Sequence, residues 1–296
     1  MMVGRLHPVL TVFFAVLILT FAGGPVLLSL YGSVVPDRIL LSQDQSILTA
    51  GPSFETYRYV FTGQLPESYL QESANRAMIS DAARQVPRAL LNSSLNALAV
   101  MALNLILGAP AAFVFARYLF PGKKISFLYL ILSPLVPAVA LVTPIYMTMQ
   151  WLGLVGTSVG IILVHTARAL PFTVLILSVF FRRIPPEIFE AAMLDHCSRF
   201  QTFWRVAVPL ALPSIGATGL FAFMLSYSEF MFSMVLSGTA ATRPVSVVMA
   251  ALARNTDVSW SLLNTGIFLA IVPTLVLVVL VWRFVVEGLL SGAVKG

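Results

Sequence analysis

The sequence predicts an all-α protein that crosses a membrane through six helices. Of its 296 residues, 58% are hydrophobic and only 10% are charged, whereas an ordinary soluble domain carries about 25% charged residues. Six apolar runs are each long enough to cross about 30 Å of hydrocarbon, which takes roughly 20 helical residues. The runs lack the strict polar and apolar alternation of a membrane-spanning β-strand. We therefore expect a polytopic, helical membrane protein.

The six runs give the order of the expected helices. They are residues 8–35, 89–116, 126–152, 156–181, 206–238 and 261–282. Two of them contain a charged side chain, since Arg168 interrupts the fourth run and Glu229 the fifth. Prolines at positions 134, 137, 144, 171 and 273 are interpreted as kinks.

The first run belongs to an N-terminal domain, residues 1–35, with one transmembrane helix. Arg5 precedes it and small residues follow at positions 22–24, which is also the layout of a secretory signal peptide. A signal peptide has an apolar core of roughly 7–15 residues, and this run continues past Gly24 to Tyr31. We expect a retained helix, with a cleaved signal peptide as the alternative.

Residues 36–87 are predicted to be an extracytoplasmic segment. Residues 36–88 hold six acids and five arginines, so their charges nearly balance. The aromatic stretch FETYRYVF, residues 54–61, suggests a small packed cap or a segment at the membrane interface.

Basic residues between the runs predict the orientation, because cytoplasmic loops collect Lys and Arg. With the N-terminus inside, the short outside loops hold only Arg243 and Arg254. The inside segments then hold Arg5, Arg117, Lys123, Lys124, Arg182, Arg183, Arg199, Arg205, Arg283 and Lys295. We expect both termini in the cytoplasm, and the net charge of +6 then reflects topology instead of a nucleic-acid partner.

A polar segment, residues 184–208, separates the fourth and fifth runs and is called the elbow below. Pro186 suits the first position of a helix, and acids at positions 187 and 190 favour its positive end. Ile188, Phe189, Ala192 and Met193 would form one apolar face. We expect this helix to end near Asp195.

A second helix should follow within the elbow. Ser198 and Gln201 have the spacing of a capping box, in which each side chain satisfies a backbone N–H of the other. The elbow is therefore predicted to be helix, turn, helix. It either lies on lipid headgroups or docks into another protein, and the small Ala191 and Ala192 beside Glu190 favour protein contact.

Cofactor chemistry finds no support in this chain. The chain has a single cysteine, Cys197, and its three histidines, at positions 7, 165 and 196, lie in separate segments, so we expect no metal site. The stretch FPGKKIS contains Gly-Lys, but a phosphate-binding loop would need glycine at Arg117 and Ser or Thr at Lys124. If ATP drives this protein, another chain binds it.

The elbow carries a family resemblance. EAAMLDHCSRFQTFWRVAVPLALP resembles the Glu-Ala-Ala loop of bacterial ABC importer permeases, which runs E-A-A, then D-G, then P-L-x-x-P. Glu190, Ala191, Ala192, Asp195, Pro209, Leu210 and Pro213 match. Further stretches, among them FARYLFPGKK, YSEFMFSMVL and GLLSGAVKG, are similar to carbohydrate permeases related to the second maltose permease, MalG. The resemblance covers residues 88–296, whereas the first 87 residues match the family only in layout.

The resemblance implies a type I ABC importer fold and a multi-pass protein of the bacterial cytoplasmic (inner) membrane that is not itself an enzyme. Five helices and the elbow would form a transmembrane domain, residues 88–284, followed by a cytoplasmic tail, residues 285–296. The implied partners are a second homologous permease, an ATPase dimer that binds ATP and Mg, an extracytoplasmic sugar-binding protein and membrane lipid, with no nucleic acid.

The resemblance also implies which residues couple the permease to its ATPase. The elbow residues are Phe189, Glu190, Ala191, Ala192, Met193, Asp195 and His196. In the C-terminal tail the contacts are Val294, Lys295 and Gly296.

His196 departs from the family pattern, which has glycine after the aspartate. Glycine adopts positive φ most readily, although His, Asn and Asp are the less costly substitutes. We expect a looser or differently shaped turn. His196 either contacts the ATPase and makes coupling pH-sensitive, or is a tolerated substitution.

Candidates for the pore are the polar residues inside the runs. Glu229 lies in YSEFMF and is interpreted as a gating or helix-pairing residue. Arg168 could pair with Glu229, reach toward the outer surface or line the pore. Tyr227, Asn92 and Asn96 could bind a polyol or join helices.

The predicted function is that of a permease subunit in an ATP-driven importer of oligosaccharides or disaccharides. The alternatives are a permease for a non-sugar solute, such as a polyamine or amino acid, and an ATP-independent membrane protein with an interfacial helix. A secondary transporter would show internal repeats and several intramembrane acids, and an intramembrane enzyme would need paired catalytic groups, for which only His165 and Glu229 come close.

Overall fold

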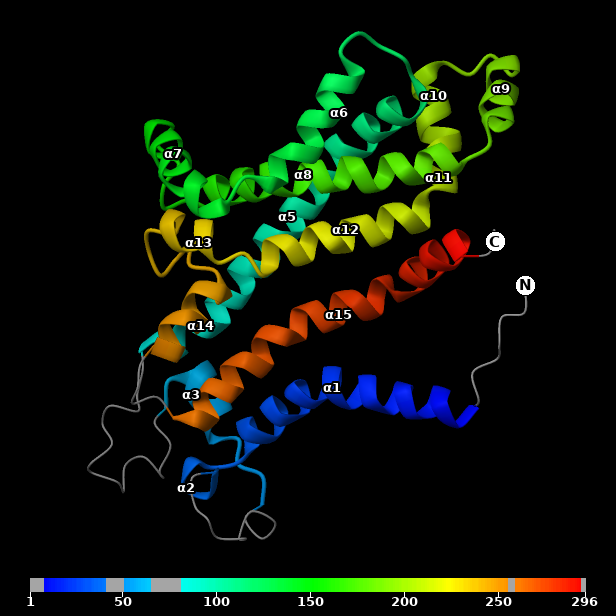
Figure 1. Ribbon diagram of the computed structural model, residues 1–296. Helices are drawn as coiled ribbons and strands as arrows, with labels where there is room; N and C mark the ends of the chain where they lie inside the picture. The colour runs from blue at the N-terminus through cyan, green and yellow to red at the C-terminus, as the bar shows by residue number, and fades with distance from the viewer. Residues whose placement is uncertain (1–7, 41–50, 65–80, 255–258, 294–296) are drawn as a thin grey trace. The chain divides into compact units, whose positions relative to one another are not determined.

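Every regular element in the described part of the chain is a helix (Figure 1). The computed structural model describes residues 8–40, 51–64, 81–254 and 259–293. Four helices are continuous and long enough to cross a membrane: α1 (Pro8–Val34), α5 (Asp81–Arg117), α8 (Ser158–Arg183) and α15 (Trp260–Ala293). The predicted all-α fold class is confirmed.

Two further spans are bent pairs of helices. The first joins α6 (Lys123–Leu132) and η3 (Ser133–Leu135) to α7 (Ala138–Trp151) at 103°, and the second joins α10 (Arg199–Thr202), η4 (Phe203–Ala207) and α11 (Val208–Leu210) to α12 (Leu212–Tyr227) at 81°. The described residues thus hold four spans, or up to six if each bent pair is one span.

Prolines explain the first bend. Pro134 lies in η3, and Pro137 directly precedes α7 while Val136 is extended. Proline has no N–H to continue a helical ladder and disfavours helical geometry in the residue before it. Pro144, Pro171 and Pro273, by contrast, lie inside continuous helices.

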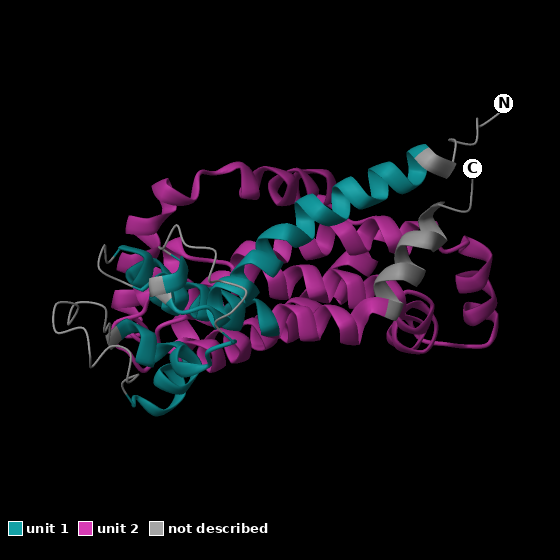
Figure 2. Cartoon of the chain, turned by 90° about the horizontal axis from the view of Figure 1, so that it is seen from below, with its two compact units in different colours: residues 1–87, 248–272 teal, residues 88–247, 273–296 magenta. Residues whose placement is uncertain are grey.

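The chain forms two compact units (Figure 2). Unit 1 comprises residues 1–87 and 248–272, and unit 2 comprises residues 88–247 and 273–296. Several helices extend from one unit into the other. The two units are not the four domains that the sequence suggests, and the division into four domains stays a prediction. The remaining helices are α2 (Asp37–Leu40), α3 (Glu55–Thr62), α9 (Pro186–Leu194), α13 (Met231–Leu236) and α14 (Val245–Arg254).

In unit 1, α3 is the packed part of the aromatic stretch. Tyr59 and Val60 are 2% and 3% exposed. The hydroxyls of Thr56 and Thr265 lie 2.8 Å apart and join α3 to α15. Phe54 and Phe61 of the same stretch are 62% and 59% exposed, so the choice between a packed cap and a segment at the membrane interface stays a prediction.

In unit 2, α8 is the most enclosed of the long helices. Half of the residues in its most apolar 18-residue stretch are buried. Its backbone comes close to α5 at Gly108, where a β-carbon would lie 2.6 Å from Thr173 Cγ2. One turn away, the Thr173 hydroxyl donates to Asn104 Oδ1 at 3.1 Å, and both residues are fully buried.

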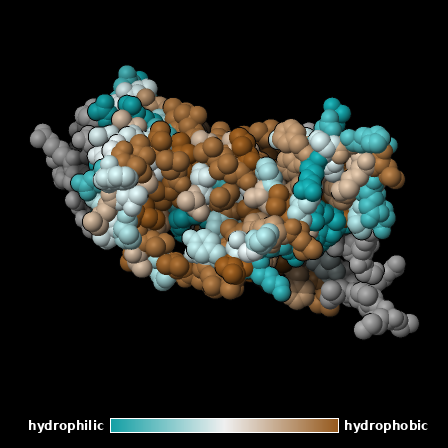
Figure 3. All heavy atoms as spheres, turned by 90° about the horizontal axis from the view of Figure 1, so that it is seen from above, coloured by the Kyte–Doolittle hydropathy of each residue, from teal (hydrophilic) through white to brown (hydrophobic). Residues whose placement is uncertain are grey.

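Large apolar side chains remain exposed on the spans. In α1, no residue of the most apolar 18-residue stretch is buried, and Leu19 and Phe21 are 71% and 84% exposed. Hydrophobic residues, in brown, cover wide areas of the face shown in Figure 3. A membrane solvates such surfaces, whereas water would not.

Candidate functional site

The first half of the elbow forms the predicted helix, α9. It begins at Pro186 and is capped at Asp195, as expected from the proline and the acidic first turn. Ile184 and Pro185 precede it with non-helical ψ angles of 126° and 138°, so α8 and α9 are separate helices.

The turn after α9 is regular despite its histidine. His196 has φ 56°, the left-handed conformation that glycine usually supplies. Its N–H donates to the Met193 carbonyl, and the N–H of Cys197 donates to the Ala192 carbonyl, each at 3.0 Å. These two bonds complete a Schellman motif. The expectation of a looser or differently shaped turn is therefore wrong, because His196 adopts the backbone conformation itself.

The second half of the elbow confirms the predicted capping box. The Ser198 hydroxyl accepts the Gln201 N–H at 3.3 Å, and Gln201 Oε1 accepts the Ser198 N–H at 2.8 Å. The helix α10 then widens into the π-helix η4, where the Val208 N–H reaches the Phe203 carbonyl five residues back. Such widened turns often occur at functional positions.

The two faces of α9 divide the residues that the sequence assigned to coupling. Phe189 and Ala192 are each 6% exposed and face the protein. Glu190, Ala191, Met193, Asp195 and His196 are exposed. Ile188 and Met193, which the sequence places on one apolar face with Phe189 and Ala192, are 37% and 56% exposed, so only part of that face packs against the protein. The outer face is free to meet a partner, while the inner face holds α9 to unit 2.

Four phenylalanines hold the elbow to the ends of α5 and α8. Phe113 of α5 lies 5.6 Å from Phe181 of α8, 5.8 Å from Phe189 of α9 and 5.3 Å from Phe203 of η4, measured between ring centroids. Each of the four is at most 6% exposed. We call this set the phenylalanine cluster. It connects both halves of the elbow to two membrane helices through direct contact.

Arg117 reinforces the same junction. Its guanidinium carbon lies 4.3 Å from the centre of the Phe189 ring, a cation–π contact. Its NH2 group donates to the carbonyl of Phe181 at 2.6 Å and to that of Ile184. These carbonyls belong to the last turn of α8 and the residue after it, which lack helical partners. The sequence pattern identified Arg117 only as a cytoplasmic charge and gave no sign of this role.

A second polar group lies deep in unit 2 and is called the His165–Glu229 network. It consists of His165, Arg168, Ser226, Glu229 and Ser233. His165 Nε2 lies 3.2 Å from Glu229 Oε2, and Arg168 NH1 lies 3.2 Å from Glu229 Oε1. The side chains of His165 and Glu229 are 2% and 8% exposed, and that of Arg168 is 44% exposed. His165 and Arg168 are three residues apart and so share one face of α8.

Serines complete the polar partners of His165. Its Nδ1 lies 2.9 Å from the Ser226 hydroxyl, and Nε2 also lies 3.3 Å from the Ser233 hydroxyl. When Nε2–H donates to the carboxylate, Nδ1 accepts the Ser226 hydroxyl. Both ring nitrogens are therefore satisfied, which a buried imidazole requires.

The Glu229 carboxylate also caps the N-terminus of α13. Its carboxylate accepts the backbone N–H of Phe232 at 3.1 Å and of Ser233 at 3.0 Å. These donors of the first turn have no helical acceptor, and α13 has no side-chain cap at Phe230. One carboxylate thus fixes the break between α12 and α13 and attaches it to α8.

The network shows the contact that Arg168 makes, and it includes His165, which the sequence did not predict as a pore residue. Arg168 pairs with Glu229, the first of its three expected roles, and also lines a cavity of about 440 Å³ with Phe172 and Leu225. His165 was not among the predicted pore residues. The sequence singled out His165 and Glu229 only as a near-match for paired catalytic groups, and did not predict their contact.

Two of the other three pore candidates, Asn92 and Tyr227, have structural contacts. The Asn92 side-chain amide donates to the carbonyls of Ala241 at 2.9 Å and Arg243 at 3.1 Å, so it holds the loop before α14. Tyr227 is 8% exposed and stacks on Phe223 with centroids 5.5 Å apart. Asn96 is 4% exposed. Their role in a pore stays a prediction. Val294, Lys295 and Gly296 lie outside the described residues.

Comparison with known proteins identifies the family. Residues 104–289, more than half of the chain, match the family described as "Binding-protein-dependent transport system inner membrane component". The chain belongs to this family. It is therefore a transport permease, a multi-pass protein of the inner membrane, and its family implies a substrate-binding protein and an ATPase as partners in general terms.

Relatives of this inner-membrane component support the assignment. The trehalose transport system permease protein SugB of Mycobacterium tuberculosis is 30% identical over 86% of each chain. The diacetylchitobiose uptake system permease protein NgcG of Streptomyces coelicolor is 29% identical over 69% of this chain and 68% of its own. A solved bacterial ABC transporter, involved in the import of the acidic polysaccharide alginate, matches 96% of this chain and 99% of its own with a TM-score of 0.71 at 18% identity. The ABC importer permease fold is shared.

Proposed function

We propose that this chain is one of two permeases in an ATP-driven, binding-protein-dependent importer of oligosaccharides or disaccharides. It forms half of the pore and couples to an ATPase through the elbow. The observation that carries the proposal is the phenylalanine cluster, because it places α9 in direct contact with the ends of α5 and α8.

Coupling uses the two faces of α9 differently. The exposed face, with Glu190, Ala191 and Met193, docks into the ATPase. Phe189, on the inner face, transmits movement to Phe113 and Arg117, which lie 5.8 Å and 4.3 Å from it. Close-packed interiors transmit displacement with little loss, so a shift of α9 moves the membrane helices that line the pore.

The proposed assembly contains four further protein partners. They are a second permease, two ATPase subunits that bind ATP and Mg, and an extracytoplasmic sugar-binding protein. No cofactor binds this chain itself, and ATP hydrolysis belongs to the ATPase subunits. Both termini lie in the cytoplasm, an orientation supported by the excess of Lys and Arg in the segments on that side.

The His165–Glu229 network acts as a gating junction. Glu229 holds α8, through His165 and Arg168, to the break between α12 and α13. Alternating access moves helices as rigid bodies around a central site. A junction that fixes one such break therefore favours one arrangement of the pore.

A sugar is the proposed solute because of what the relatives carry. Their names specify trehalose and diacetylchitobiose. The alternatives from the sequence, a polyamine or amino acid, have no comparable support from these relatives.

Uptake by the complete importer in proteoliposomes tests the proposal. We expect labelled trehalose, maltose or diacetylchitobiose to accumulate only with internal ATP and the binding protein, and to be lost with an ATPase variant that cannot hydrolyse ATP. Uptake of a polyamine or amino acid instead would contradict the sugar assignment. Uptake of any solute without ATP would contradict the importer mechanism.

A further inference from the structure

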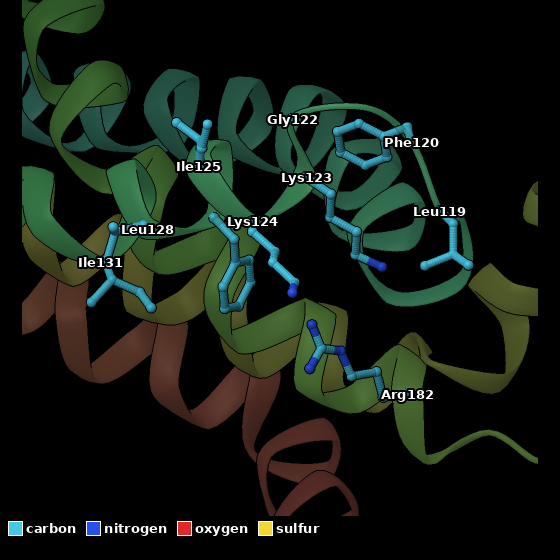
Figure 4. Close-up of a pocket in the computed structure, with 10 residues that line it drawn as sticks. Leu119, Phe120, Gly122, Lys123, Lys124, Ile125, Leu128, Ile131 and Arg182 are labelled. Carbon is cyan, nitrogen blue, oxygen red and sulfur yellow. The ribbon is translucent and has the colours of Figure 1, made fainter.

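A cationic, apolar groove lies on unit 2 beside the start of α6 (Figure 4). It has a volume of about 920 Å³. Its walls come from the loop between α5 and α6, from α6 itself and from Arg182 near the end of α8. The function proposed above gives this groove no role.

One side of the groove is an exposed apolar surface. Leu119 in the loop is 94% exposed, and Ile125, Leu128 and Ile131 along α6 are 76%, 54% and 44% exposed. The three α6 residues follow one another at intervals of three, so they form a continuous strip along the helix. A strip of this kind at a membrane span suits an extended hydrocarbon chain.

The other side carries three basic side chains. Lys123, Lys124 and Arg182 all line the groove, and Figure 4 shows their charged ends turned toward a shared space. No acidic residue is among those that line it. Lys123 Nζ donates to the Tyr118 carbonyl at 2.8 Å, and Arg182 lies over the Phe127 ring at 5.3 Å. Neither contact neutralises a positive charge.

Backbone polarity adds to the positive potential at the same place. The helix α6 starts at Lys123 without a side-chain cap. The Lys123 N–H donates to the Phe120 carbonyl at 3.2 Å, and the helix dipole favours an anion at this end. The residue before it, Gly122, has φ 80°, a conformation that favours glycine, and glycine places no β-carbon at the entrance.

The groove also lies at one end of three membrane helices. The helix α5 ends at Arg117, α6 begins at Lys123 and α8 ends at Arg183. Such a level corresponds to the boundary between hydrocarbon and headgroups, where basic side chains meet lipid phosphates. A soluble anion would use the cations but leave the apolar strip unused.

We propose that this groove binds an anionic phospholipid, whose phosphate contacts Lys123, Lys124 and Arg182 and whose acyl chain lies on Ile125, Leu128 and Ile131. Three positive charges without a neighbouring acid favour an anionic headgroup over one that carries its own cation. The site is independent of which solute the importer carries.

Photolabelling of the complete importer tests the site. Phosphatidylglycerol and phosphatidylcholine, each with a diazirine in the acyl chain, are compared, and labelled peptides are mapped by mass spectrometry. We expect phosphatidylglycerol to label residues 119–131 at least about fivefold more than phosphatidylcholine. Equal labelling by both lipids would overturn the proposal, and this comparison needs no variant.

A matched pair of double variants identifies the charges responsible. Lys124→Gln with Arg182→Gln should reduce phosphatidylglycerol labelling about 25-fold, since each basic residue near an anionic membrane contributes about a fivefold gain in affinity. Arg183→Gln with Arg205→Gln removes the same charge outside the groove and should change labelling less than about twofold. An equal reduction in both variants would overturn the site.

Two further outcomes distinguish other occupants. Competition by soluble glycerol phosphate as effective as that by unlabelled phosphatidylglycerol would show a site for free phosphate and overturn the lipid proposal. A photoreactive amino acid at Leu128 should attach to lipid. Its attachment to the second permease instead would show that the groove is a protein interface.

Discussion

Replacing Phe113 with alanine should uncouple the elbow from the membrane helices. Phe113 is 4% exposed and lies within 5.8 Å of four aromatic rings, of Tyr118, Phe181, Phe189 and Phe203. Truncating a core phenylalanine costs about 3–5 kcal/mol in total. Two of the four rings belong to the elbow, and each aromatic pair contributes about 0.5–1.5 kcal/mol. The elbow therefore loses about 1–3 kcal/mol of its attachment.

That loss corresponds to a change of about 5- to 150-fold in the coupled population. We expect sugar uptake per ATP hydrolysed to fall at least about fivefold, while basal ATPase activity of the complex persists. The assay measures uptake and ATP hydrolysis on the same proteoliposomes.

A matched variant controls for loss of aromatic packing in general. Phe221→Ala removes an aromatic contact to Phe172 at 6.0 Å, outside the phenylalanine cluster, and should leave the ratio of uptake to hydrolysis unchanged. A wild-type ratio in an assembled Phe113→Ala complex would refute the reasoning. So would an equal fall in both variants.

Three further substitutions test other features of the structure. Glu229→Gln should destabilise the protein by about 3 kcal/mol in detergent melting, because His165 loses its buried carboxylate; an unchanged melting temperature would contradict this. His196→Gly should raise stability by about 0.5–1 kcal/mol, since relief of a left-handed β-carbon outweighs the added unfolded-state entropy; a loss would show that the imidazole makes a stabilising contact. Gly108→Val should lower the folded yield by fluorescence size exclusion, while Gly23→Val, where a β-carbon meets open space, should not; equal yields would place α5 farther from Thr173.

The sequence predicted the elements whose causes are local. Pro186 and the Ser198 and Gln201 pair determine where the elbow helices begin, because a helix start depends on residues within one turn. The apolar runs likewise indicate spans by length alone. The bend of 103° was foreseen only as kinks at Pro134 and Pro137, because a proline permits a break without fixing its angle, and no kink was predicted at the bend of 81°.

Contacts between distant residues could not be predicted in the same way. Phe113 meets Phe189 across 76 positions and His165 meets Glu229 across 64, and no local pattern encodes either pairing. Which part of the apolar face of α9 is buried could not be predicted for the same reason. Periodicity marks which residues share a face, but Met193 is exposed because the surface that covers Phe189 does not extend to it.

The division of α9 into a docking face and an attached face can be tested directly by crosslinking. With Cys197 replaced by serine, single cysteines are placed at exposed Ala191 and at Ala192, which is 6% exposed, and crosslinked to cysteines scanned across the ATPase. We expect a strong crosslink from position 191 that changes with ATP, and a weak one from position 192. Equal crosslinks from both positions, or none with lipid-accessible labelling at position 191, would contradict the account.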